Sequence, residues 1–151
     1  MDIKIDNLES GDVIQLLQEH MQDMLATSPA ESVHALDVPA LKAPSITFFS
    51  ARECGQLLGC VAIKELSTTN AEIKSMRTHS HARNSGVAST LLEHVLVVAK
   101  KRGYESLSLE TGSMAFFKPA RKLYIKYGFT PCEPFSNYQS DPNNTFMSID
   151  L

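Results

Sequence analysis

Apolar and polar residues alternate with the period of a strand at the start of the chain and with the period of a helix soon after. Residues 3–5 alternate one by one, which predicts a short strand. Between about residues 10 and 25 the apolar side chains return every three or four positions, which predicts an amphipathic helix. Pro29 stops this pattern and suits the first turn of a second short helix, which we expect over residues 30–36.

Three extended segments follow, at residues 46–51, 57–66 and 71–78. They are rich in β-branched and aromatic residues, which favour strands. Short polar turns at 53–55 and 67–70 separate them. This spacing predicts an antiparallel meander of three strands.

The longest helical pattern covers residues 85–102. Its apolar face consists of Val87, Leu91, Leu92, Val95, Val98 and Ala99. Basic residues at 100–102 suit the negative end of a helix dipole, and Gly103 suits the position after the last turn. An extended segment around 107–109 comes next, and strand–helix–strand predicts a right-handed parallel crossover.

The last third of the chain predicts a helix at 119–127, which Gly128 ends, and an extended segment at 129–132. An irregular stretch rich in proline and asparagine leads to a final strand at 145–149. The order of elements predicts one α+β domain over residues 1–151. We expect a mixed, mostly antiparallel sheet of about six to seven strands, flanked by about four helices.

Composition excludes several classes of protein. The chain is 43% hydrophobic and 21% charged, with a formal net charge of −3, so no basic excess indicates a nucleic-acid partner. No window approaches the roughly 18 apolar residues of a membrane span, so we expect no membrane partner. The N-terminus does not resemble a signal peptide, and the three cysteines form no Cys-x-x-Cys pair. These features favour reduced thiols and a cytoplasmic protein.

The turn before the long helix, Arg83-Asn84-Ser85-Gly86-Val87-Ala88, predicts an anion site. Its backbone amides fall at the helix N-terminus, where unpaired N–H groups and the positive dipole end meet. The small residues allow a phosphate to approach the backbone. The turn lacks the glycines and lysine of a P-loop and the three glycines of a dinucleotide fingerprint. A plain helix-capping turn and a nucleotide site both stay open as alternatives.

A second motif, Tyr124-x-x-x-Gly128-Phe129, follows the turn by about 36 residues. With both motifs and the same order of elements, the chain resembles the GNAT superfamily of acetyl-CoA-dependent N-acetyltransferases. The resemblance implies a GNAT-like fold and acetyl-CoA as cosubstrate. Many members carry an asparagine seven residues before the motif tyrosine, and Phe117 stands there in this chain.

The resemblance also implies a set of cofactor-binding residues. The strand before the turn, ending in Met76-Arg77-Thr78, would splay from its parallel neighbour and bind pantetheine. The pyrophosphate would lie on Arg83 and the amides of residues 84–88. By the same resemblance Tyr124 would protonate the leaving thiolate, and Glu72 matches a glutamate that acts as general base in part of the family.

Amide formation from a thioester requires a neutral amine, although an alkyl ammonium has a pKa of about 10. A base or a desolvated site is therefore needed, and Glu110, at the end of the neighbouring strand, is the alternative to Glu72. His79 and His81 flank the turn, but no third ligand accompanies them, so we predict no metal.

Residues that could contact the acceptor lie in the early helices and the late loop. The candidates are Glu31, Ser32, His34, Glu110 and Tyr138. We expect acetyl transfer to a primary amine by direct attack in a ternary complex, with a small-molecule amine favoured over a protein amine. A coenzyme A-binding sensor without catalysis is the alternative function, and a homodimer is a further expectation from the resemblance.

Overall fold

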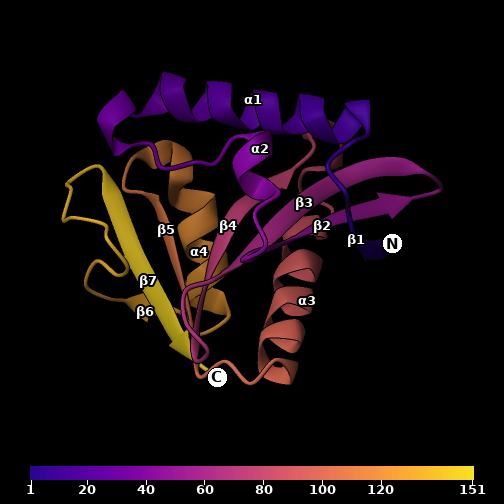
Figure 1. Ribbon diagram of the computed structural model, residues 1–151. Helices are drawn as coiled ribbons and strands as arrows, with labels where there is room; N and C mark the ends of the chain where they lie inside the picture. The colour runs from indigo at the N-terminus through magenta and orange to yellow at the C-terminus, as the bar shows by residue number, and fades with distance from the viewer.

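The computed structural model describes residues 1–151 as a twisted sheet with helices on both faces (Figure 1). The strands are β1 (Asp2–Ile5), β2 (Ile46–Glu53), β3 (Gln56–Glu65), β4 (Asn70–Thr78), β5 (Ser106–Gly112), β6 (Thr130–Pro131) and β7 (Asn144–Asp150). The α-helices are α1 (Gly11–Thr27), α2 (Val38–Leu41), α3 (Val87–Lys101) and α4 (Lys118–Lys126). Three 3-10 helices are η1 (Ala30–Ser32), η2 (Ser80–Ala82) and η3 (Ala115–Phe117).

Alternation along the strands divides the core between the two faces of the sheet. Phe48 of β2 packs in a cluster with α1 and α2, whereas its neighbour Phe49 packs in a larger cluster with α3 and α4. In β3, Cys60 and Val61 divide in the same way. Successive side chains of a strand point to opposite faces, so one stretch of apolar sequence supports two layers of helices.

The seven strands lie in the order β1-β2-β3-β4-β5-β7-β6. Every neighbouring pair is antiparallel except β4 and β5, which α3 connects as a parallel crossover. The prediction of a mixed, mostly antiparallel sheet of six to seven strands with about four helices is confirmed.

Strands β4 and β5 separate halfway along their length. Their parallel pairing runs from Asn70 opposite Ser106 to Ile73 opposite Leu109 and then stops, although both strands continue. Ser75 has a φ of 54°, and the pairing of β3 with β4 changes register nearby. A left-handed residue and a register shift bend a strand away from its neighbour. The predicted splay is therefore present, and it opens a gap between β4 and β5.

Two local predictions were wrong. The helix expected over residues 30–36 is only the single 3-10 turn Ala30–Ser32, and α2 lies where Pro39 and Pro44 had suggested a loop. Helix α2 forms because the Asp37 side chain accepts a hydrogen bond from the Ala40 amide at 2.9 Å, while Pro39 suits the first turn. None of the helices combines the length and apolar character needed to cross a bilayer.

Candidate active site

A cavity of about 490 Å³ lies between the end of β4, the turn before α3, and α4. The residues predicted to bind the cofactor that line it are Met76, Arg77, Thr78, Arg83, Asn84, Gly86, Val87 and Ala88. Ser85 belongs to the same turn but does not line the cavity, because its hydroxyl donates to the carbonyl of Ala82. The structure thus brings eight of the nine predicted residues to one cavity.

The backbone of this turn leaves the first amides of α3 without side-chain partners. Gly86 is the N-cap residue with a φ of 83°, and no side chain caps the helix. Asn84 is also left-handed, with a φ of 61°, a conformation that asparagine tolerates better than most residues. Free N–H groups and the helix dipole at an exposed turn form a site for an anion such as a pyrophosphate.

A second cavity, of about 150 Å³, lies in the gap between β4 and β5. The segment between α1 and α2 runs past this end of the sheet (Figure 1) and contributes lining residues, among them His34. Six residues line both cavities, namely His20, Met24, Met76, Phe117, Ala120 and Tyr124. The two cavities therefore meet, and a chain that fills the first can reach a group held in the second.

Tyr124 lies at this junction. Its side chain is buried and packs edge-on against Phe129, with ring centroids 5.7 Å apart. Burial raises the pKa of the Tyr124 phenol to about 12, so the hydroxyl is neutral at pH 7 and can donate a proton. The same apolar surroundings would also raise the pKa of a thiol leaving group next to Tyr124. The pKa of the thiol would then lie closer to that of the phenol that protonates it.

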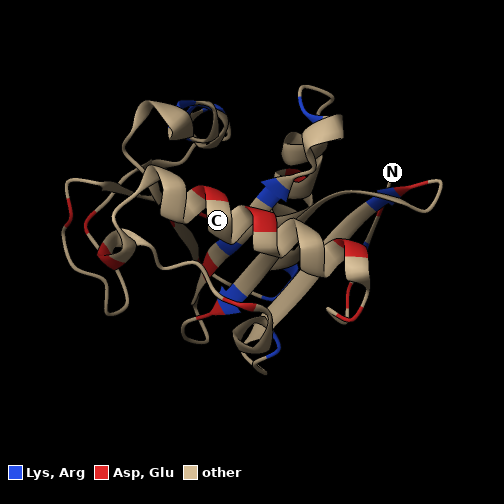
Figure 2. Cartoon of the chain, turned by 90° about the horizontal axis from the view of Figure 1, so that it is seen from above, with Lys and Arg blue, Asp and Glu red and all other residues tan.

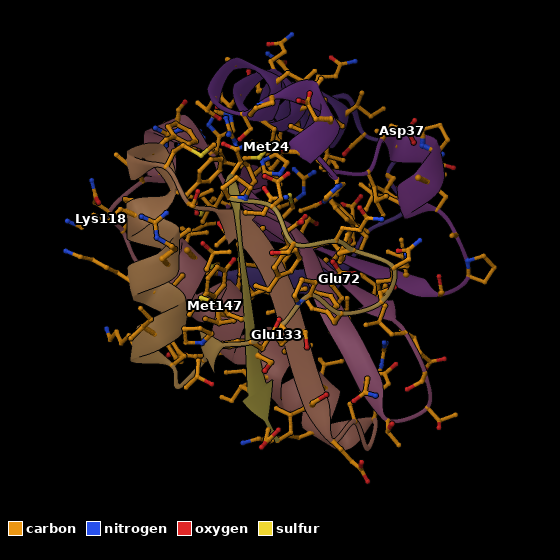
Figure 3. The ribbon with its side chains drawn as sticks, turned by 90° about the vertical axis from the view of Figure 1, so that its left-hand side faces the viewer. Met24, Asp37, Glu72, Lys118, Glu133 and Met147 are labelled. Carbon is orange, nitrogen blue, oxygen red and sulfur yellow. The ribbon has the colours of Figure 1, made fainter.

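Glu72 lies deep in the smaller cavity, on β4. Its side chain is 2% exposed, and Oε2 accepts hydrogen bonds from the Tyr138 hydroxyl at 2.8 Å and from Lys74 Nζ at 3.3 Å. In Figure 3 the segment before β7, which carries Tyr138, crosses in front of Glu72. Burial and the adjacent carboxylate hold the pKa of the Tyr138 phenol well above its usual range. Glu72 Oε1 has no partner in the protein.

Glu110 projects into the same cavity from β5. His34 Nδ1 lies 2.8 and 2.7 Å from its two carboxylate oxygens, and Asn144 donates to Oε2 at 3.0 Å. Burial raises the pKa of the Glu110 carboxyl, and the neighbouring His34 partly opposes this shift. Glu72 and Glu110, the two carboxylates considered as bases from the sequence, thus occupy one small cavity from neighbouring strands.

The other residues predicted to contact the acceptor differ in whether they line the smaller cavity. Ser32 lines the cavity, but its hydroxyl donates to Asp141 at 2.5 Å, which fastens η1 to the segment before β7. Glu31 is exposed and lines neither cavity. Tyr138 lines neither cavity, but its hydroxyl is hydrogen-bonded to Glu72 and Lys74, which line the smaller one.

Phe117 occupies the position where members of the family often have asparagine. Its buried ring packs so closely on Gly112 that a Cβ at residue 112 would lie 2.0 Å from it. Phe117 also lines both cavities. The cavities therefore have the apolar ring of Phe117, rather than an asparagine amide, beside Tyr124.

Helix α1 contributes a residue that the sequence did not single out. His20 lies on the apolar face of α1 and lines both cavities, and burial together with Arg77 lowers its pKa to about 4. Arg77 is held by Asp23 of α1 at 2.7 Å; Figure 2 shows the acidic residues along this helix. One feature of the sequence could have pointed to His20: it lies at helical spacing between Leu17 and Met24, on a helix face that is otherwise apolar.

Buried polar atoms without a protein partner concentrate at these cavities. Of five such atoms, four are His20 Nδ1, Glu72 Oε1, Ser75 Oγ and Arg77 Nε, all on residues that line one or both cavities. Buried polar groups are normally hydrogen-bonded, so this concentration fits a polar ligand such as the amide-containing pantetheine chain. No group of three or more His, Cys, Asp or Glu side chains is placed to hold a metal ion.

Comparison with known proteins shows the family of the chain. The family model for the Acetyltransferase (GNAT) family matches residues 13–129. The chain is 54% identical over 151 residues, the full length of both chains, to the uncharacterized N-acetyltransferase YsnE of Bacillus subtilis. The chain belongs to the GNAT family. As a member it is an N-acetyltransferase, and acetyl-CoA is its acetyl donor.

Solved structures show the same fold. A putative acyl-CoA N-acyltransferase from Klebsiella pneumoniae matches with a TM-score of 0.80 and 23% identity, over 99% of this chain and 97% of that one. A GNAT family acetyltransferase from Elizabethkingia anophelis, with acetyl-CoA bound, matches with a TM-score of 0.70 and 18% identity, over 99% and 97% of the chains. The resemblance inferred from the two sequence motifs is confirmed.

Proposed function

We propose that the protein transfers the acetyl group of acetyl-CoA to the primary amine of a small molecule by direct attack in a ternary complex. One observation carries this proposal: the cavity beside the turn at residues 83–88 and the smaller cavity with two carboxylates open onto the same buried tyrosine, Tyr124, from two sides. A cofactor chain can enter from one side while an amine occupies the other.

The larger cavity suits the pyrophosphate and the pantetheine of coenzyme A. In this arrangement the pyrophosphate lies on the amides of residues 84–88 with Arg83 beside it, and pantetheine follows Met76 to Thr78. The unpaired Arg77 Nε and Ser75 Oγ are available to its amide groups. The thioester then reaches the junction, where the Tyr124 hydroxyl can protonate the departing sulfur.

The smaller cavity favours a small acceptor. Its volume of about 150 Å³ is well below the roughly 300–1,000 Å³ of a pocket for a drug-sized ligand. The segment between α1 and α2 and the segment before β7 are bonded across it through Ser32 and Asp141. Such a space accepts the amine-bearing end of a compact molecule more readily than a folded protein surface.

The charges of this cavity suit an ammonium group. Glu72 and Glu110 place two carboxylates in it, and Lys74 offsets one of them. The free oxygen of Glu72, Oε1, can accept a hydrogen bond from the ammonium. The sequence predicted Glu72 as the general base, and whichever group acts as the base here must bring the amine to its neutral form before attack.

Direct attack is favoured because no cysteine lies at the site. Cys54 is exposed in the turn between β2 and β3, and Cys132 follows β6. Cys60 is buried, and burial raises the pKa of its thiol to about 12, so it is a poor nucleophile. None of the three lines either cavity.

An amine-panel assay tests the proposed function. Purified protein is incubated with acetyl-CoA and α-amino acids, diamines, polyamines or lysine-containing peptides, and thiol release is measured together with the mass of each amine. We expect catalytic acetylation of one class of small amine and much slower reaction of the peptides. Tight binding of acetyl-CoA without thiol release for any amine would instead indicate a coenzyme A-binding sensor.

A further inference from the structure

The smaller cavity contains a second acid–base arrangement besides Glu72. His34, in the segment between η1 and α2, and Glu110, on β5, are 76 residues apart in sequence yet in direct contact. The His34 side chain is 32% exposed and that of Glu110 is 11% exposed. The histidine is thus accessible from the cavity, while the carboxylate behind it is largely shielded.

The contact fixes the histidine by one ring nitrogen only. Nδ1 lies 2.7 and 2.8 Å from the Glu110 oxygens, and Nε2 takes part in no hydrogen bond. Because a carboxylate accepts hydrogen bonds, a neutral His34 carries its proton on Nδ1 and leaves the Nε2 lone pair free. This is the arrangement by which a carboxylate orients a catalytic histidine and stabilises its protonated form.

Two further contacts hold the pair in position. The His34 ring packs on Tyr138, with centroids 4.9 Å apart and an interplanar angle of 31°. Asn144 donates to Glu110 Oε2 at 3.0 Å and to the Ser32 carbonyl at 3.1 Å, so one amide joins the carboxylate to the segment that carries the histidine. These contacts keep the pair preorganised.

We propose that His34 is the general base for the acceptor amine, and that Glu110 is a positioning residue that holds its Nδ1 tautomer. This role rests on the proposed acetyl transfer to an amine. It differs from the prediction from sequence, in which Glu72 takes the proton. Glu72 already accepts bonds from Lys74 and Tyr138, so it is better suited to bind the ammonium than to remove its proton.

The reaction balances with these groups. The ammonium gives one proton to His34 Nε2, which passes it to water, and the neutral amine attacks the thioester carbon. The C–N bond forms and the C–S bond breaks. A second proton leaves the nitrogen and replaces the one that Tyr124 gives to the thiolate. The net products are the amide, free coenzyme A and one proton.

Charged and titratable groups face His34 from each element packed on it. They are Glu110 of β5, Tyr138 and Asp141 of the segment before β7, and, beyond Tyr138, Glu72 and Lys74 of β4. Because the proposed base must be unprotonated to accept the proton of the amine, the activity should rise with pH, and replacing His34 should remove that rise.

The test is the pH dependence of kcat/KM for the best amine of the panel, measured for His34→Gln, His34→Ala, Glu72→Gln and the parent. We expect His34→Gln to lower kcat about 100-fold and to remove the rise of kcat/KM with pH, while KM for acetyl-CoA stays within about threefold. Exogenous imidazole should partly restore His34→Ala. The Glu72→Gln protein should bind the amine more weakly but keep the pH dependence of kcat/KM that the parent shows. His81→Gln, outside both cavities, is the matched control and should behave as the parent.

A readout independent of turnover completes the test. Imidazole ¹⁵N shifts should show His34 protonated on Nδ1 in the neutral parent protein, and Glu110→Ala should shift the ring toward the other tautomer. The role of His34 would be overturned, with acetyl transfer intact, if His34→Gln left the pH dependence of kcat/KM unchanged. It would also be overturned if Glu72→Gln removed that dependence instead. Failure of the parent to acetylate any amine would overturn the proposed function, and this role with it.

Discussion

A single methyl group at Gly86 tests whether the turn before α3 holds the pyrophosphate. Gly86 has a φ of 83°, and a Cβ built there meets no protein atom within 4 Å. Gly86→Ala therefore creates no clash inside the protein. It adds the cost of a left-handed L-residue, about 1–2 kcal/mol, to the free energy of folding.

The effect on cofactor binding should be larger than this strain alone explains. Backbone amides that contact a charged phosphate contribute about 1.5–3 kcal/mol each. Loss of one such contact weakens binding at least about tenfold, since about 1.4 kcal/mol corresponds to a factor of ten. We expect isothermal titration calorimetry to show this loss for coenzyme A but not for pantetheine, which lacks the pyrophosphate.

Gly55 and Gly103 provide matched controls. Their φ values are 79° and 82°, and neither has an atom within 4 Å of a built Cβ. Gly55 lies in the turn between β2 and β3, and Gly103 follows α3 at its other end. Alanine at either position should cost similar stability and leave coenzyme A affinity unchanged. Equal coenzyme A affinities for Gly86→Ala and Gly55→Ala would refute the placement of the pyrophosphate.

Three other variants test separate parts of the site and core. Tyr124→Phe should lower thiol release by about 10²-fold or more while acetyl-CoA affinity changes little, because only the proton donor is lost; normal turnover would remove Tyr124 from the chemistry. Lys74→Ala should lower the free energy of unfolding in urea by about 3–5 kcal/mol, because Glu72 would be buried without its cation; a loss below about 1 kcal/mol would contradict this. The pKa of His20 is about 4 in the folded protein, below the ordinary histidine value of 6.5, so the unfolded chain binds more protons between these limits. Stability should therefore fall by about 2 kcal/mol from about pH 7.5 to about pH 5, and His20→Asn should remove that part of the slope.

The sequence predicted the features that depend on short-range patterns. The turn at residues 83–88 and the helix after it were predictable because small residues, a glycine and an apolar face follow one another without a gap. The position of Tyr124 relative to Gly128 and Phe129 was readable for the same reason. The two motifs together identified the family.

The acceptor side was not predictable in the same way, because its contacts join distant parts of the chain. His34 meets Glu110 across 76 residues, and Tyr138 meets Glu72 across 66. No local pattern encodes either contact; both depend on how the segments after α1 and before β7 cross the gap between β4 and β5. Helix α2 was missed because its four residues are too few to show a helical period, and only the Asp37 cap marks it.

Intact-mass spectrometry of a single turnover tests direct transfer most directly. Protein in excess is mixed first with acetyl-CoA alone and then with the best amine of the panel, and the masses of protein and amine are followed in time. We expect an unmodified protein throughout and one acetyl group on the amine only after the amine is added. An acetyl group on the protein before the amine is added, passed on afterwards, would contradict direct attack in a ternary complex.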